Sequence, residues 1–257
     1  MKLHNFPWGL YPRRVIIYLA EKGVVDVELV DIEPHKTEGW PPSFLRALNP
    51  ASTLPVLDVG EGTVVRQSLA ILEYLEERFP TPDMIGATQA ARATTRELIA
   101  VIDEATTFFG IWAHKGSRLF AGRETPSAEA AATGAEKYAG KLRLLEAMVA
   151  GGPFLAGDAV TIADCVVVAL LQFVGEFYGV SLPVDCPKLA AWYERFSRRP
   201  SVPHCIYPPE LLSFSYGLLE QTLNTSSCSS PPVDLGVCGA VHDAARRDWD
   251  DWDSRLG

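Results

Sequence analysis

Residues 48–75 constrain the fold more than any other part of the chain, because they contain signals for four elements in a fixed order. A polar loop leads to Pro55, which begins a β-branched run that ends at the turn Gly60-Glu61-Gly62. Gln67 and Ser68 then precede apolar residues at helical spacing. The segment predicts a loop, a hairpin of two strands, and a helix that starts at Ser68.

Both ends of this segment are expected to expose hydrogen-bonding groups. A proline at the start of a strand loses little from its missing N–H, and cis X–Pro bonds, about 5–6% of those in folded proteins, usually mark constrained turns. With a cis bond before Pro55, Leu54 would turn its backbone N–H and C=O outward toward an extended peptide. The Ser68 hydroxyl and the free amides at the positive end of its helix suit a carboxylate. The sequence therefore predicts a binding site for a small peptide.

Residues 1–80 alternate between strand and helix patterns. Strands are expected at residues 1–6 and 25–32, and helices at residues 12–21 and 42–48. Pro12 fits the N1 position of the first helix, and Gly23 fits its C-cap. The order of elements is that of a thioredoxin-like α/β domain.

The remainder of the chain is predicted to form an all-α domain. After a proline-rich linker at residues 80–83, apolar residues recur at helical spacing in residues 90–120 and again from Ser127 onward. Thr161 and Asp164 form a capping-box start for a further helix. Asp164 is therefore interpreted as a residue that supports folding.

Composition excludes several classes of function. The chain has 257 residues with 47% hydrophobic and 21% charged side chains, which is typical of a globular protein. A net charge of −9 argues against a nucleic acid or an anionic membrane as the main partner. The start of the chain lacks a signal-peptide pattern, and no stretch is long enough to span a bilayer, so we expect a cytoplasmic protein. The five cysteines show no metal spacing and are expected to be reduced thiols, with no metal site.

These motifs resemble those of the cytosolic glutathione S-transferases. Residues 48–75 are similar to the family pattern NPxGxVPxL followed by [EQ]-S-x-A-I-xx-Y-L, with Ser52 and Leu54 in place of the usual glycine and valine. Residues 153–164 resemble the pattern FLxGxxxTxAD, and residues 187–202 resemble the helix that follows it. The resemblance implies a thioredoxin-like domain at residues 1–80 that binds glutathione, an all-helical domain at 86–223, and a homodimer. It ends near residue 204. Beyond that point, the apolar residues at 208–223 predict a further helical stretch, and the composition of residues 224–257 predicts a partly flexible extension.

The resemblance also implies a set of binding residues. Glutathione, the co-substrate, would be held by Thr53, Leu54, Pro55, Gln67 and Ser68. A hydrophobic electrophile would lie between the loop at residues 7–11 and the helix at residues 90–120. The candidate side chains for this acceptor are Phe108, Phe109, Trp112, His114 and Lys115, although core packing or a solvated face would also explain each of them.

The turn before the first helix lacks the residue that activates the thiol in many relatives. Counting back from Arg14 and Val15 places Gly9 at the position of the usual serine or cysteine, and a mostly microbial subgroup with the pattern P-x-x-P-N-P-R-R-V is similar to this turn. Tyr11 is a candidate catalytic hydroxyl, or else an aromatic ring packed against the second domain. Trp8 is a candidate N–H donor to sulfur, or else a wall of the acceptor pocket. The amides of the helix alone are a third means of stabilising a thiolate.

Two functions therefore follow from the sequence. The first is a transferase that adds the glutathione thiolate to a xenobiotic or a secondary metabolite, by conjugation, epoxide opening or glutathione-assisted isomerisation, in a detoxifying role. The second is a non-catalytic glutathione-binding or regulatory protein of the same fold. This hypothesis follows from Gly9, which stands where the activating serine or cysteine is expected. Trp249 and Trp252 lie in a charged tail that either folds back over the acceptor cleft or the dimer surface, or is disordered.

Overall fold

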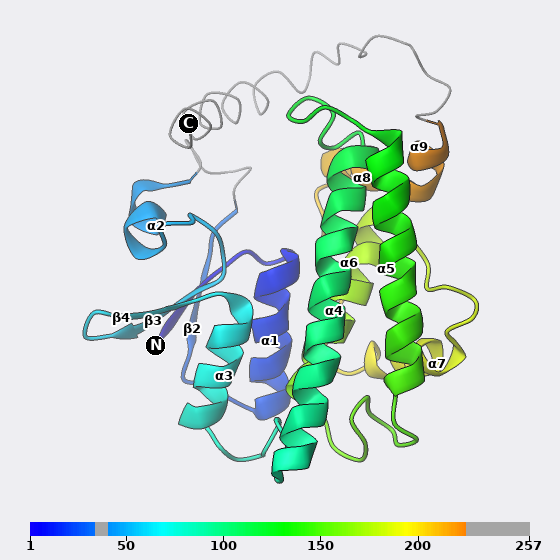
Figure 1. The fold of residues 1–257 in the computed structure, drawn as a ribbon. Coiled ribbons are helices and arrows are strands. Elements are labelled where there is room, and N and C mark those ends of the chain that lie inside the picture. Colours follow the sequence, from blue (N-terminus) through cyan, green and yellow to red (C-terminus); the bar gives the residue numbers. More distant parts are fainter. Residues whose placement is uncertain (34–40, 225–257) are drawn as a thin grey trace.

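The structure, a computed structural model, describes residues 1–33 and 41–224. Its sheet has four strands in the order β2-β1-β3-β4. β1 (Lys2–Asn5) pairs in parallel with β2 (Glu28–Asp31) and antiparallel with β3 (Val56–Gly60), which forms a hairpin with β4 (Thr63–Arg66). Figure 1 shows this sheet on one side of the molecule and the long helices on the other.

Three helices belong to the sheet half: α1 (Leu10–Lys22), α2 (Ser43–Leu48) and α3 (Ser68–Arg78). α1 starts two residues earlier than the sequence predicts, with Gly9 as its N-cap, so Pro12 stands third in the helix and not first. This is still within the first turn, where a missing N–H removes no helical hydrogen bond. The predicted C-cap is confirmed, since Gly23 is left-handed with φ of 70°.

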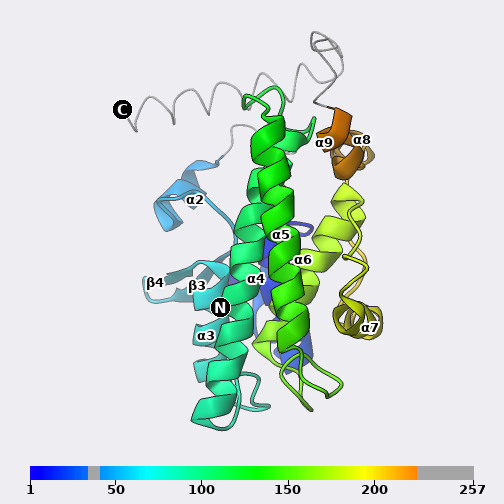
Figure 2. The same cartoon turned by 45° about the vertical axis from the view of Figure 1, so that its right-hand side comes forward.

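The helical half consists, in the described residues, of α4 (Gln89–Gly116), α5 (Ala128–Met148), α6 (Ile162–Tyr178), α7 (Pro187–Phe196), α8 (Pro209–Ser215) and α9 (Leu218–Asn224). α4 and α5 lie side by side in both views (Figures 1 and 2). The predicted helical stretch at residues 208–223 is divided, because Gly217 adopts a φ of 78° between α8 and α9. Thioredoxin-like α/β plus all-α is therefore the observed fold class.

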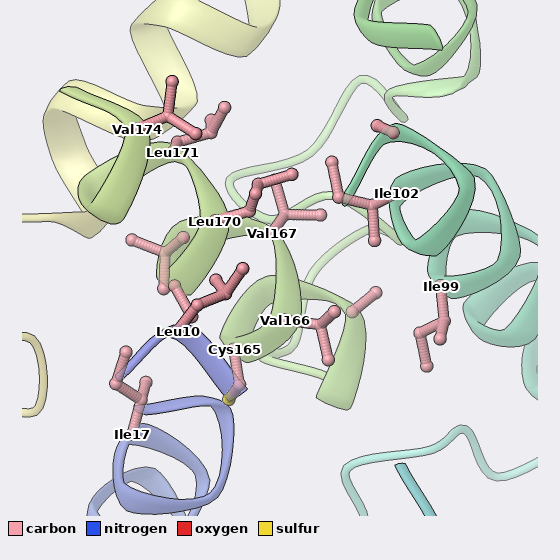
Figure 3. Packing of buried hydrophobic residues seen from close by; sticks show 14 of the residues in the cluster. Leu10, Ile17, Ile99, Ile102, Cys165, Val166, Val167, Leu170, Leu171 and Val174 are labelled. Atoms are coloured by element: carbon pink, nitrogen blue, oxygen red, sulfur yellow. The ribbon is translucent and has the colours of Figure 1, made fainter. Parts of the chain in front are cut away.

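α6 lies at the centre of the core. Most of its side chains are buried, and Figure 3 shows Cys165, Val166 and Leu170 among apolar side chains from α1 and α4. The capping box at its start is confirmed. Asp164 is fully buried and accepts hydrogen bonds from the backbone N–H groups of Leu155 and Thr161, at 3.0 and 2.8 Å, and from Trp192 Nε1 at 2.9 Å. These contacts agree with a folding role for Asp164.

Polar contacts join the two halves through α1. Glu21 accepts two hydrogen bonds from the Arg199 guanidinium, at 2.6 and 2.8 Å, and one from Ser201. Arg13, which is buried, donates to the Gln172 side chain and, at 2.7 Å, to the carbonyl of Pro203. α1 is thus fixed between the sheet and α6, which sets the position of the loop that precedes it.

Among the helices of the described ranges, none combines the length and the apolar character that a membrane crossing requires. Cys165, Cys186 and Cys205 are free thiols, as the sequence predicts. The expectations for Cys228, Cys238, Trp249 and Trp252 fall outside the described residues.

Candidate active site

The register of the sheet brings three distant segments to one edge. Val56, the first residue of β3, pairs with His4 of β1 on one side and with Arg66 of β4 on the other. The loop after β1, the loop before β3 and the start of α3 after β4 therefore meet at the same end of the sheet. The predicted peptide site and the turn at Gly9 are neighbours for this reason.

The loop before β3 presents the backbone of Leu54. The Leu54–Pro55 peptide bond is cis, as the sequence suggests. Asn49, which is buried, donates from Nδ2 to the carbonyl of Thr53 at 2.8 Å and to its Oγ1 at 3.1 Å. Neither the N–H nor the C=O of Leu54 forms a hydrogen bond to another described residue. Asn49 thus holds the loop in place, and Leu54 is left with a donor and an acceptor for a ligand.

The start of α3 offers a second set of donors. Gln67, its N-cap, has a φ of 70°, an uncommon conformation for a residue other than glycine and one that recurs at functional sites. Ser68 follows and is buried, and the N–H groups of the first turn have no partners within the helix. A carboxylate at this point would receive hydrogen bonds from the amides and the hydroxyl.

Arg14 adds a positive charge behind Ser68. Its side chain is buried, and Nη1 lies 3.5 Å from Ser68 Oγ and 2.9 Å from Asp103 Oδ1. Nη2 donates to Thr106 Oγ1 at 3.0 Å. The salt bridge between Arg14 and Asp103 therefore connects α1 to α4 close to the start of α3.

The turn at Gly9 has no room for a side chain. A Cβ atom built on Gly9 would lie 2.7 Å from Cδ1 of Phe6, closer than such atoms approach in proteins. Since Pro12 has no N–H, the free amides at the start of α1 are those of Leu10 and Tyr11. A thiolate at this point would therefore be stabilised by backbone donors.

Tyr11 lies beside the arginine of the site. Its ring is half-exposed, with the Arg14 guanidinium 4.8 Å from the ring centroid. Burial, together with the charge of Asp103, raises the pKa of the Tyr11 hydroxyl, although Arg14 acts to lower it. The hydroxyl is therefore protonated near neutral pH and can serve as a hydrogen-bond donor, not as a base.

Trp8 is packed in an aromatic cluster. Its ring centroid lies 4.2 Å from that of Phe6, 5.6 Å from that of Phe177 and 5.8 Å from that of Tyr207. Trp8 is thus part of an apolar surface, and both of its predicted roles, as a donor to sulfur or as a wall of the acceptor pocket, stay predictions. Phe177 and Tyr207 were not among the residues predicted from the sequence, although the spacing of Phe173 and Phe177 on α6 is a signal for an aromatic face.

Two of the predicted acceptor residues belong to the core. Phe109 and Trp112 are each 3% exposed, and both pack against Tyr138 of α5. Trp112 also donates from Nε1 to Thr222 at 2.8 Å. Their burial agrees with core packing, the alternative that the sequence offered for these two rings, and a contact with the acceptor stays a prediction. Phe108 is half-buried and has Lys137 of α5 over its ring, so it faces α5.

His114 and Lys115 are both paired with one carboxylate. His114 Nδ1 lies 2.5 Å from Glu124 Oε1, and Lys115 Nζ lies 2.9 Å from Glu124 Oε2. Burial acts to raise the pKa of Glu124, but the hydrogen bonds from His114 and Lys115 outweigh it and hold that pKa below its ordinary value. Their role toward an acceptor stays a prediction.

The face of α4 that meets α1 offers a different set of residues. Asp103 contacts Arg14, and helical spacing places Thr107, Gly110 and Ile111 on the same side of α4. Ile111 is 41% exposed, and a Cβ atom at Gly110 would meet only open space. Figure 1 shows α4 continuing past the first turn of α1. Gly110 and Ile111 were not predicted from the sequence, because helical spacing relates them to Asp103 but does not show that Asp103 faces α1.

Within residues 1–33 and 41–224, no three histidine, cysteine or acidic side chains gather closely enough to bind a metal ion.

Two family models match the chain. The model described as "Glutathione S-transferase, N-terminal domain" matches residues 8–78, and "Glutathione S-transferase, C-terminal domain" matches residues 99–200. The first match covers both the Gly9 turn and the start of α3, and the second extends from the middle of α4 through α7.

Curated relatives and solved structures agree with these models. Glutathione S-transferase 2 of Saccharomyces cerevisiae is 31% identical over 79% of this chain and 88% of its own. The Stringent starvation protein A homolog of Coxiella burnetii is 33% identical over 76% of this chain and 85% of its own. The crystal structure of a glutathione S-transferase domain-containing protein from Marinobacter aquaeolei VT8 superposes with a TM-score of 0.70 at 32% identity, covering 79% of this chain and 100% of that one.

Proposed function

The chain belongs to the glutathione S-transferase family, and we propose that it binds glutathione at the end of the sheet and adds the glutathione thiolate to a hydrophobic electrophile. One observation supports this most strongly. The unpaired backbone of Leu54 and the start of α3 at Ser68 lie at one edge of the sheet, with the buried Arg14 behind Ser68.

Each part of glutathione has a matching group in this proposal. The γ-glutamyl carboxylate binds Ser68, Gln67 and the first amides of α3, and the charge of Arg14 favours the anion. The cysteinyl backbone forms two hydrogen bonds with Leu54, beside Thr53 and Pro55. The cysteinyl sulfur then points toward the free amides at the start of α1.

The thiolate is the nucleophile of the proposed reaction. The Leu10 and Tyr11 amides and the Tyr11 hydroxyl stabilise the anion, so that more of it is present at neutral pH. Its sulfur forms a bond to an electrophilic carbon. In a substitution the leaving group departs with the bonding electron pair, and in an epoxide opening the alkoxide takes a proton from water. Isomerisation uses the same addition and then expels the thiolate again.

The acceptor is proposed to lie between Trp8 and α4. The aromatic cluster of Trp8, Phe177 and Tyr207 forms one apolar wall, and Ile111 with the open space at Gly110 forms the other. Apolar walls of this kind suit a hydrophobic acceptor. His114, three residues after Ile111 on α4, stays a candidate for orienting the substrate.

We also propose that the protein is a homodimer, that it is located in the cytoplasm, and that its role is detoxification. A groove of about 460 Å³ between α3 and α4 is lined by apolar residues such as Leu69 and Ile99 and by the ion pair of Arg96 with Glu73, at 3.0 Å. We propose that a second copy covers this groove. The exposed Ala100 lines it, so Ala100→Arg should convert the dimer to a monomer in sedimentation equilibrium, while an unchanged mass would contradict this interface.

A second candidate function is supported by the crowding at Gly9. A protein that binds glutathione without turning it over needs no activating side chain, and Phe6 occupies the space where one would begin. Titration calorimetry with glutathione tests what both functions share, and the absence of binding would contradict both.

Turnover separates the two functions. We expect the wild type to conjugate glutathione with chlorodinitrobenzene, and Tyr11→Phe to lower kcat by about tenfold through the loss of one hydrogen bond to the thiolate. Tyr216→Phe is a matched control, because Tyr216 is exposed and lies after α8. Binding without turnover would support the non-catalytic function, and equal turnover in Tyr11→Phe would remove Tyr11 from the mechanism.

A further inference from the structure

A second cavity lies in the helical half, on the other side of α6 from Trp8. It has a volume of about 290 Å³ and is lined by residues of α5, α6 and α7, by the turn after α6, and by Tyr216. Phe177 on α6 faces Trp8, whereas Gly175, two residues earlier, lines this cavity. Residues two apart on a helix lie on nearly opposite faces. The cavity is therefore separate from the site proposed for glutathione and its acceptor.

The hydroxyl of Tyr138 opens into the cavity without a protein partner. Tyr138 is 3% exposed, its ring is held by Phe109 and Trp112, and it is among the residues that line the cavity. Its hydroxyl forms no hydrogen bond to any other residue that the structure describes, and it is not among the polar atoms that are buried without a partner, so its oxygen is reachable from the cavity. A ligand that accepts a hydrogen bond can therefore pair with this donor in place of water.

The hydroxyl is also fixed as a donor. Burial, with a smaller effect of the nearby Tyr193, raises the pKa of Tyr138 well above that of an ordinary tyrosine. Tyr138 is therefore a neutral phenol at any physiological pH. Tyr193 lines the same cavity and provides a second hydroxyl.

The remaining walls favour a flat and uncharged molecule. None of the described residues that line the cavity carries a charge, and Leu171, Val180 and Leu182 give it apolar surface. At its rim, the ring of the exposed Tyr216 lies against Gly179, where a Cβ atom would be only 2.8 Å from Cζ of that ring. An exposed aromatic ring beside an apolar cavity provides a stacking surface.

The rim is anchored to the end of α6. Ser215 Oγ donates to the carbonyl of Phe177 at 2.7 Å, and the N–H of Gly217 donates to the carbonyl of Tyr178 at 3.0 Å. Because Ser215 and Gly217 flank Tyr216, these two hydrogen bonds hold the Tyr216 ring over Gly179. Figure 2 shows α7 and α8 on the side of the helical half that faces away from the sheet, and the cavity is lined by Tyr193 of α7 and by Tyr216, which follows α8.

We propose that this cavity, lined by Tyr138, Gly175, Tyr193 and Tyr216, is a second ligand site for a neutral one- or two-ring aromatic molecule that carries a hydrogen-bond acceptor such as a ketone. The ring system lies among the apolar walls and against Tyr216, and its oxygen accepts a hydrogen bond from Tyr138. The volume is at the lower end of the range for small-molecule sites, which limits the ligand to this size.

The test uses prodan, a neutral naphthyl ketone whose emission shifts to the blue in an apolar site. The full-length protein is first saturated with S-hexylglutathione, so that the glutathione and acceptor sites are occupied. We expect one prodan to bind per chain under these conditions. Tyr138→Phe, which removes only the hydroxyl, should weaken binding by about threefold to tenfold.

Two leucine substitutions provide a matched pair. A Cβ atom at Gly175 would meet only the carbonyl of Val180, at 3.9 Å, so Gly175→Leu should fill the cavity and abolish prodan binding without straining the helix. Gly140 is exposed on α5 with open space around it, so Gly140→Leu should bind prodan as the wild type does. Displacement of prodan by S-hexylglutathione would overturn the proposal. So would a prodan affinity in Gly175→Leu and Tyr138→Phe equal to that of the wild type. Circular dichroism confirms that each variant is folded.

Discussion

The glutathione end of the sheet and the acceptor side of α4 are built by different means. At the sheet end, the binding groups are mainly backbone atoms whose positions follow from strand register, from the Leu54–Pro55 bond and from the start of α3. On the acceptor side, the groups are side chains from the Trp8 loop, α4, α6 and the segment that contains Tyr207. If the two sites are as proposed, the first should tolerate side-chain substitutions better than the second, because its binding groups belong to the backbone.

Arg13 and Arg14 are consecutive residues of α1, but their side chains lie in different regions. Arg14 points toward Ser68 and is neutralised by Asp103, so it belongs to the glutathione end. Arg13 points toward α6 and bonds to neutral oxygens of Gln172 and Pro203, so it belongs to the junction with the helical half. Both side chains are buried, and exchanging their roles would require turning the helix.

The largest effect is expected for Arg14→Met. The change removes a buried guanidinium and leaves Asp103, which is 46% exposed and can be solvated, so we expect a loss of about 2–3 kcal/mol in the free energy of unfolding. Glutathione affinity should fall by at least about tenfold, because the carboxylate loses its counter-charge. Urea unfolding and titration calorimetry measure the two quantities.

The matched variant is Arg13→Met. It should lower the free energy of unfolding by about 1–2 kcal/mol through its lost hydrogen bonds, while the glutathione Kd stays within about twofold of the wild type. If both arginine variants weaken glutathione binding equally, the division between the two regions is wrong. Arg14→Lys, which keeps the charge, distinguishes a lost charge from a disturbed fold.

Ser68→Ala tests the sheet end with a smaller change. One hydrogen bond to a carboxylate is lost, so the KM for glutathione should rise by about tenfold, with the acceptor KM unchanged. Steady-state kinetics with each substrate varied in turn measure both values. A rise in the KM for the acceptor alone would indicate that Ser68 belongs to the acceptor side and not to the glutathione end.

Ile111→Ala is the corresponding change on the acceptor side. Because Ile111 is 41% exposed, its removal should leave the fold intact and raise the acceptor KM by about threefold to fivefold, with the glutathione KM unchanged. Leu144→Ala is a control, since Leu144 is similarly exposed at 44% but lies on α5. An equal effect of both variants would show that Ile111 does not contact the acceptor.

The smallest effect concerns the pH dependence of the junction between the two regions. Burial acts to raise the pKa of Glu21, but hydrogen bonds from Arg199 and Ser201 outweigh it and lower that pKa below its ordinary value of 4.5. The stability that ionised Glu21 contributes to the folded state is therefore complete above about pH 4.5. It is lost as the pH falls through the lower pKa that Glu21 has in the folded protein.

Glu21→Gln measures this contribution. At pH 7 the variant should be less stable than the wild type by about 1 kcal/mol in urea unfolding. At pH 3 the difference should narrow, because the wild-type carboxyl is then protonated in the unfolded chain. A difference that stays constant between these two pH values would exclude ionisation of Glu21 as its origin.

The two regions also differ in how far the sequence predicted them. The strand after Pro55 and the helix that starts at Ser68 were predicted because both depend on local signals, a proline at the start of a β-branched run and apolar residues at helical spacing. The burial of Phe109 and Trp112 in the helical core could not be predicted in this way, because helical spacing shows that residues share a face but not which neighbour that face meets. Tyr207 was missed since its contact with Trp8 joins residues far apart in the chain. The pairing of Arg14 with Asp103 shows which face of α4 meets α1. This pairing is visible only in the tertiary structure.

The contact between Gly9 and Phe6 links two parts of the molecule that the chain could otherwise vary independently. A Cβ atom at residue 9 would lie 2.7 Å from the Phe6 ring, so a side chain there requires that ring to move. The same ring packs on Trp8, at 4.2 Å between ring centroids. A substitution at Gly9 is therefore also a change in the aromatic cluster, and these positions are expected to vary together.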